Sequence, residues 1–166
     1  DKLLGGPQAG IVVGKKDLVD RLARHPLARA VRIDKLSLAS LSATLVHYLR
    51  GEAEQEIPVW RMISTPEGDL KKRATSWQSG LECPSAVTES RSAVGGGSLP
   101  GETLPSWVLS VDCQSTGAEE VMRRLRENNP PVVARIDEDR VLLDPRTVLP
   151  EEDGPLLDAL RAAVAQ

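Results

Sequence analysis

Hydrophobic and polar positions divide the chain into a helical first third and a remainder of mixed helices and strands. The strongest pattern predicts a helix over residues 35–50, with its N-cap at Asp34 and its end at Gly51. The apolar positions of this helix recur every three or four residues, at Leu38, Leu41, Leu45 and Leu49.

Weaker amphipathic patterns predict further helices. They cover residues 15–24, a short piece opened by Pro26, residues 65–80, residues 117–128, and a last helix from a cap at Asp153 to about residue 165. In the 65–80 helix, Leu70, Ala74 and Trp77 fall on one face, so we expect them in the core.

Apolar and β-branched runs predict strands at residues 9–13, 86–94, 107–112, 132–136 and 140–143. From residue 86 onward the order is strand, strand, helix, strand, strand, helix. This order favours an α/β chain whose second part is an α+β layer, an antiparallel or mixed sheet covered on one face by helices. We expect two domains, residues 1–56 and residues 57–166.

Composition limits the class of protein. The chain has 166 residues, 40% hydrophobic, with no run long enough to span a membrane, so we expect no membrane partner. Cys83 and Cys113 have neither metal nor redox spacing, which favours free thiols in the cytoplasm and no metal site. Charge is uneven, since residues 15–35 carry seven Lys or Arg against three Asp. This basic stretch either attracts anions or is simply a solvated face.

The first candidate for chemistry is Lys2, which lies in the run DKLLGGPQAGI at residues 1–11. On spacing alone this is a solvated lysine before a glycine-proline turn. The run resembles the segment of bacterial selenocysteine synthases, the L-seryl-tRNA(Sec) selenium transferases, that carries their pyridoxal-phosphate (PLP) lysine. The resemblance implies that Lys2 is the catalytic and cofactor-binding lysine, and that Asp1 beside it helps to orient the reacting groups.

The second candidate is a pair of arginines, Arg29 and Arg32, in the run RAVRIDK at residues 29–35. On a helical turn this spacing places both guanidinium groups on one side, where they suit a tetrahedral oxyanion. Surface residues or a salt bridge with Asp34 are the ordinary alternatives. The run is similar to the family's Arg-x-x-Arg-x-Asp-Lys stretch, which implies that the pair binds the phosphate of selenophosphate.

A third stretch, GGGSLPGE at residues 95–102, also resembles the family. Consecutive glycines expose backbone N–H groups, so the loop either faces a substrate or only joins two strands. The second part of the chain shows no well-framed arginine for a free substrate carboxylate, although Arg91, Arg135 and Arg146 stay open for that role.

The resemblance implies the end of the large domain (residues 1–56) and the C-terminal small domain (residues 57–166) of a fold-type I PLP-dependent transferase. It implies conversion of seryl-tRNA(Sec) to selenocysteinyl-tRNA(Sec) by loss of the serine hydroxyl and addition of selenium from selenophosphate, in a homo-oligomeric ring of dimers. Because the chain starts with Asp inside a motif, we expect a fragment that is inactive alone and holds PLP weakly. The alternatives are a fold-type I PLP enzyme for a free amino acid, or a non-catalytic module for assembly or tRNA docking.

Overall fold

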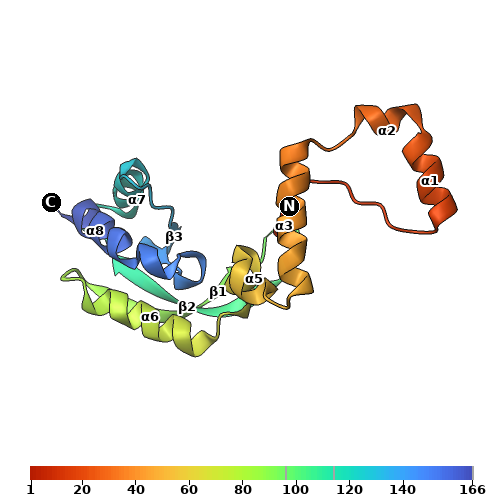
Figure 1. Cartoon of the computed structure of the whole chain (residues 1–166). Coiled ribbons are helices and arrows are strands. Elements are labelled where there is room, and N and C mark those ends of the chain that lie inside the picture. Colours follow the sequence, from red (N-terminus) through yellow and green to blue (C-terminus); the bar gives the residue numbers. More distant parts are fainter. Residues whose placement is uncertain (96, 114, 166) are drawn as a thin grey trace. The chain divides into compact units, whose positions relative to one another are not determined.

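The computed structural model describes residues 1–95, 97–113 and 115–165 (Figure 1). The chain forms two compact units, Asp1–Arg61 and Met62–Gln166. Their boundary lies close to the predicted one between residues 56 and 57. The assignment of the predicted domains to two parts of a PLP enzyme stays a prediction.

The first unit is helical. Its helices are α1 (Lys16–Arg24), α2 (Pro26–Ala30), α3 (Lys35–Leu49), α4 (Ala53–Glu56) and the start of α5 (Pro58–Ser64). The predicted N-cap of α3 is confirmed, because the Asp34 carboxylate accepts hydrogen bonds from the backbone N–H groups of Leu36 and Ser37 at 2.9 and 3.0 Å. Gly51, with φ of +72°, follows the helix end, as a residue without a Cβ can.

The strand predicted at residues 9–13 is wrong. This segment has no regular secondary structure, and the side chains of Ile11, Val12 and Val13 are 54%, 65% and 87% exposed. A β-branched run has strand propensity, but a strand forms only where a neighbouring strand receives its hydrogen bonds. None of the described strands pairs with this segment. It is part of the irregular segment that leads from the N-terminal turn to α1 (Figure 1).

The second unit is the predicted α+β layer. Its elements are the end of α5, α6 (Glu67–Ser79), β1 (Ser85–Ala93), β2 (Thr103–Asp112), α7 (Ala118–Glu127), β3 (Arg135–Asp137), β4 (Arg140–Leu143), η1 (Pro145–Thr147), η2 (Pro150–Glu152) and α8 (Asp153–Val164). The four strands form one antiparallel sheet in the order β1-β2-β4-β3. The turn between β3 and β4 places Glu138 and Asp139 at positive φ, as a tight hairpin requires.

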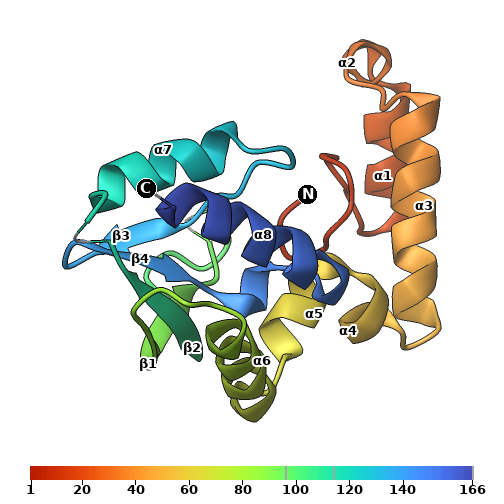
Figure 2. The ribbon, with the colours of Figure 1, turned by 90° about the vertical axis from the view of Figure 1, so that its left-hand side faces the viewer.

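The core of the second unit lies between one face of the sheet and its helices. Side chains alternate between faces along a strand, and the β2–β4 register opposes Leu109 to Leu143 and Val111 to Val141. These four side chains form one buried cluster with residues from all three helices: Trp77 of α6, Val121 and Leu125 of α7, and Leu156 and Leu160 of α8. Figure 2 shows α6, α7 and α8 around the strands. The predicted apolar face of α6 is confirmed, since Leu70, Ala74 and Trp77 are buried.

One predicted cap is wrong. Asp153 is the first residue of α8, preceded by Glu152 as N-cap, and no side chain caps the helix. The Asp153 carboxylate instead pairs with Arg73 of α6, which lies 80 positions earlier in the chain. Within the described ranges, no helix has the length and apolar content needed to cross a bilayer.

Candidate functional site

The Lys2 side chain is exposed at the start of a tight turn over residues 2–5, here called the lysine turn. The Gly5 N–H donates to the Lys2 carbonyl at 3.0 Å and closes the turn. Gly5 has φ of +78°, and a Cβ there would lie 2.2 Å from Cγ2 of the buried Ile57. Both the backbone angle and the lack of space therefore require glycine at this position.

The lysine turn and Gly6 pack against one face of α3. Leu41, Thr44 and Tyr48 are spaced at i, i+3 and i+7, which places them on the same side of the helix. A Cβ on Gly6 would lie 3.2 Å from the Thr44 hydroxyl and 3.5 Å from a Leu41 methyl. Leu41 is also the residue of α3 that is buried. The face of α3 that includes its buried residue is thus the face that contacts the segment following Lys2.

Hydrogen bonds fix the same segment. The Tyr48 hydroxyl lies 3.2 Å from the Leu3 carbonyl oxygen and 2.9 Å from that of Leu4. The indole N–H of Trp60, on α5, donates to the Tyr48 oxygen at 2.7 Å. All three contacts are partly buried, so they compete with little water.

Neither Lys2 nor Asp1 has a side-chain hydrogen bond or ion pair with any described residue, and both side chains are exposed. The Lys2 amine is therefore available to a ligand, at the first residue of a turn whose backbone contacts Tyr48 and Ile57. Among the described residues, no group of three or more His, Cys, Asp or Glu side chains is arranged to hold a metal ion.

The expected shared helical turn for Arg29 and Arg32 is not observed. Helix α2 ends at Ala30, and Val31 follows it as C-cap, so Arg32 lies beyond the helix. Both arginines are exposed, without a hydrogen bond or ion pair in the described part of the chain. The salt-bridge alternative therefore fails, because the Asp34 carboxylate is taken by its own helix.

The Asp34 contacts are themselves strong enough to affect titration. The hydroxyl and the backbone N–H of Ser37, together with the Leu36 N–H, keep the pKa of the Asp34 carboxyl below its usual value. Because it stays ionised, Asp34 is a permanent acceptor at the N-terminus of α3.

The three arginines left open for a substrate carboxylate are all engaged. Arg146 is buried and donates to the carbonyl oxygens of Met62, Ile63, Thr65 and Pro105 at 2.6–3.3 Å. This burial lowers the pKa of its guanidinium group. Arg135 donates to Ser90 and to the Arg91 carbonyl, while Arg91 donates to Thr103.

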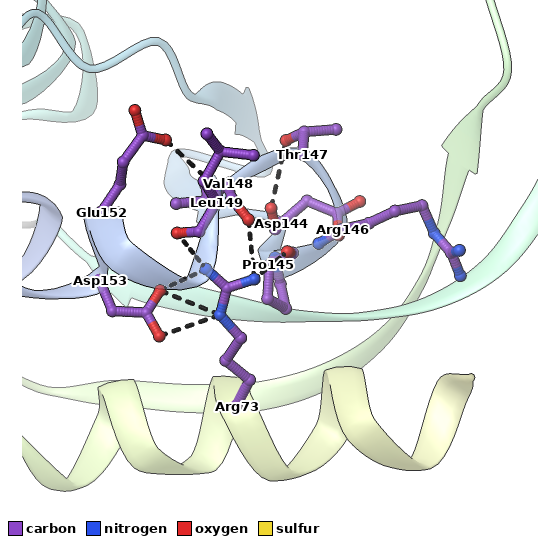
Figure 3. Close-up of polar contacts among 9 residues, drawn as sticks. All are labelled: Arg73, Asp144, Pro145, Arg146, Thr147, Val148, Leu149, Glu152 and Asp153. Atoms are coloured by element: carbon purple, nitrogen blue, oxygen red, sulfur yellow. Dashed lines mark hydrogen bonds and ion pairs between the residues drawn. The ribbon is translucent and has the colours of Figure 1, made fainter. Parts of the chain in front are cut away.

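Arg73 is likewise a structural residue. It reaches from α6 to residues 145–153, where it pairs with Asp153 and donates to three backbone carbonyl groups (Figure 3). Arg73 and Arg146 thus both donate to several backbone carbonyl oxygens of the second unit.

The glycine loop adds little to the site. Gly96 lies outside the described residues. The Gly95 carbonyl accepts hydrogen bonds from the N–H groups of Ser98 and Leu99 at 3.1 and 3.2 Å, which closes a turn between β1 and β2. A substrate-facing role for the loop stays a prediction.

Tyr48 and Trp60 are the residues of this site that sequence reasoning missed. Tyr48 is the single tyrosine of the chain and lies near the end of α3, while Trp60 lies in the short apolar run of α5. The contacts of Tyr48 with residues 3 and 4 leave no local sequence signal, because they span 45 and 44 positions.

A profile of the family described as "SelA: L-seryl-tRNA selenium transferase" matches residues 1–149. The chain belongs to the L-seryl-tRNA selenium transferase family. Curated family members include L-seryl-tRNA(Sec) selenium transferases of Moorella thermoacetica, 45% identical over 172 residues, and of Carboxydothermus hydrogenoformans, 43% identical over 157 residues. That of Aquifex aeolicus is 44% identical over 156 residues.

These alignments cover 92–99% of the chain and 34–36% of the relatives, so the chain spans about a third of their length. The sequence resemblance to this enzyme family is thus confirmed. A solved structure of D-glucosaminate-6-phosphate ammonia-lyase aligns over 83% of the chain and 34% of its own, with a TM-score of 0.52 and 20% identity. This likeness concerns the fold, and it agrees with the predicted fold class.

Proposed function

We propose that this chain is the part of a selenium transferase that supplies the PLP lysine, and that the whole enzyme converts seryl-tRNA(Sec) to selenocysteinyl-tRNA(Sec) with selenophosphate. The observation that carries the proposal is the family match over residues 1–149, which includes both predicted site segments. Family members bear the transferase name, and the chain matches them over nearly all of its length.

The residues present fit a carbonyl cofactor. A Schiff-base lysine needs an accessible amine on a backbone that does not move, and Lys2 has an unpaired, exposed side chain on the anchored lysine turn. When bound, PLP supplies an electron-withdrawing ring that stabilises negative charge at the substrate α-carbon. Lys2 would hold the cofactor and move the α-proton, and Asp1 beside it would help to orient the reacting groups once they are bound.

Arg29 and Arg32 are proposed to bind the phosphate of selenophosphate. Their support is availability, since both guanidinium groups are exposed and unpaired in the described part of the chain. Arginine forks bind phosphate oxygens in pairs, and two of them offset most of the charge of such an anion. Engagement of Arg91, Arg135 and Arg146 also agrees with a substrate that is esterified to tRNA and has no free carboxylate.

The finer features follow from the same family and are part of the proposal. Residues 1–56 belong to the end of a PLP-binding large domain and residues 57–166 to a C-terminal small domain. The enzyme is a cytoplasmic homo-oligomer of dimers arranged in a ring. Size measurement of the full-length protein tests the last statement directly.

The experiment uses the full-length enzyme that contains this chain, with seryl-tRNA(Sec) labelled in the serine and selenophosphate as donor. We expect selenocysteinyl-tRNA in the parent and none in Lys2→Ala. We expect Arg29→Ala and Arg32→Ala to raise the KM for selenophosphate about tenfold or more, because each loses a charge-assisted contact. Arg126→Ala is the matched control, as Arg126 is also exposed and unpaired among the described residues. Full activity in Lys2→Ala would contradict the proposal.

A further inference from the structure

We infer that Tyr48 and Trp60 are positioning residues that fix the Lys2 backbone for catalysis, an inference that rests on the proposed function. The Tyr48 hydroxyl contacts the segment that follows the lysine, Trp60 contacts the Tyr48 hydroxyl, and neither has a hydrogen bond to the Lys2 side chain. They act on its amine through the lysine turn.

The direction of each hydrogen bond follows from the chemistry of the groups. An indole N–H only donates, so the Tyr48 oxygen must accept from Trp60. The single proton of the phenol hydroxyl is then donated to the carbonyl oxygens of Leu3 and Leu4. Trp60 thus orients the tyrosine hydroxyl, and Tyr48 binds the backbone.

Two further contacts border the same segment. Gly5 lies against Ile57, and Gly6 lies against Thr44. The carbonyl groups bound by Tyr48 are one and two residues after Lys2, so their release changes the direction in which the chain presents the lysine. A displacement of about 1 Å at a reacting group costs up to about a hundredfold in rate.

The arrangement predicts different effects for the two residues. Tyr48→Phe removes all three hydrogen bonds and leaves two carbonyl groups and one indole N–H without these partners. Trp60→Phe removes one bond and leaves the tyrosine proton free to stay on the carbonyl oxygens. We therefore expect the tyrosine change to have the larger effect, and the double variant to be no worse than Tyr48→Phe.

The test uses the full-length enzyme and two readouts. The first is amide hydrogen exchange at Gly5, whose N–H closes the lysine turn, measured without substrate or added cofactor. The second is kcat and KM for seryl-tRNA(Sec). Ser42→Ala and Trp107→Phe are the controls, because one removes an exposed hydroxyl from α3 and the other changes a half-buried tryptophan in the second unit.

In Tyr48→Phe we expect Gly5 exchange about tenfold faster. We expect kcat to fall about tenfold to a hundredfold, with KM for the tRNA within about twofold. In Trp60→Phe we expect Gly5 exchange and kcat to change in the same directions, but by smaller factors. This variant provides the test if Tyr48→Phe does not fold. Unchanged Gly5 exchange in both variants, or faster exchange with unchanged kcat, would overturn the inference. Activity that survives in Lys2→Ala would instead overturn the proposed function. The exchange rate of the Gly5 amide does not depend on activity, so it tests the positioning inference separately.

Discussion

Arg73 offers the sharpest test of how the second unit is held together. All its N–H groups have acceptors: Nε contacts both Asp153 oxygens at 2.9 Å, Nη1 donates to the carbonyls of Pro145 and Val148, and Nη2 donates to Leu149 and Asp153 (Figure 3). One side chain of α6 therefore fixes the path of the chain from β4 to α8. We expect Arg73→Met to loosen this connection.

The expected size follows from burial. The side chains of Arg73 and Asp153 are 18% and 31% exposed. Removing one partner from a fully buried pair costs about 3–5 kcal/mol, and the partial exposure places this case at the lower end, about 3 kcal/mol. Methionine keeps much of the packing against the Trp77 ring, which lies 5.3 Å from the guanidinium carbon. The decrease in the free energy of unfolding then comes mainly from the lost polar contacts.

The assay is urea unfolding of the chain followed by tryptophan fluorescence, since Trp77 is buried beside the changed residue. With a slope of about 1–3 kcal/mol per molar urea, the midpoint should fall by about 1–3 M. Lys72→Met is the control on the same helix, where an exposed pair with Asp69 contributes less than about 1 kcal/mol. If Arg73→Met and Lys72→Met shift the midpoint equally, the assigned role of Arg73 is wrong.

Three other outcomes are expected. Gly5→Ala should increase proteolysis near residue 5, because its Cβ meets Ile57 and φ is positive; a cleavage rate equal to that of Gly14→Ala, where space is open, would refute this. Asp34→Ala should lower the helix content of the chain by circular dichroism at pH 7, whereas Asp34→Asn, which keeps an acceptor, should retain most of it. Contacts with Arg123 and Arg124 lower the pKa of Glu120 to about 2 from 4.5, so the stabilisation is present above pH 4.5 and is lost as pH falls through 2. A Glu120 carboxyl signal that titrates near pH 4.5 by NMR would contradict the last statement.

Local sequence patterns predicted most helices and strands of this chain. Some features depend only on residues within a few helical turns of one another, so a short window of sequence is enough to predict them. They are the apolar face of α3, its N-cap at Asp34, and the apolar face of α6 formed by Leu70, Ala74 and Trp77. The same holds for the β3–β4 hairpin. The roles of Lys2, Arg29 and Arg32 are predicted only from family resemblance, because exposed cations have no distinctive local pattern.

The errors occurred where a distant residue decides the outcome. Residues 9–13 have strand propensity but receive no strand partner among the described elements, so their backbone stays irregular. Asp153 is a residue type that often caps helices, but its carboxylate is bound by the guanidinium group of Arg73, 80 positions away. Arg32 lies beyond the end of α2.

Sequence alone therefore determined most helices and strands, their apolar faces and the family of this protein. Tertiary structure decided which polar groups meet: Tyr48 with the backbone after Lys2, and Arg146 with carbonyl groups at the end of α5 and in β2. The physical reason is that a hydrogen bond between distant residues depends on how helices and strands pack, whereas a periodic apolar face is present in the local sequence before any packing occurs.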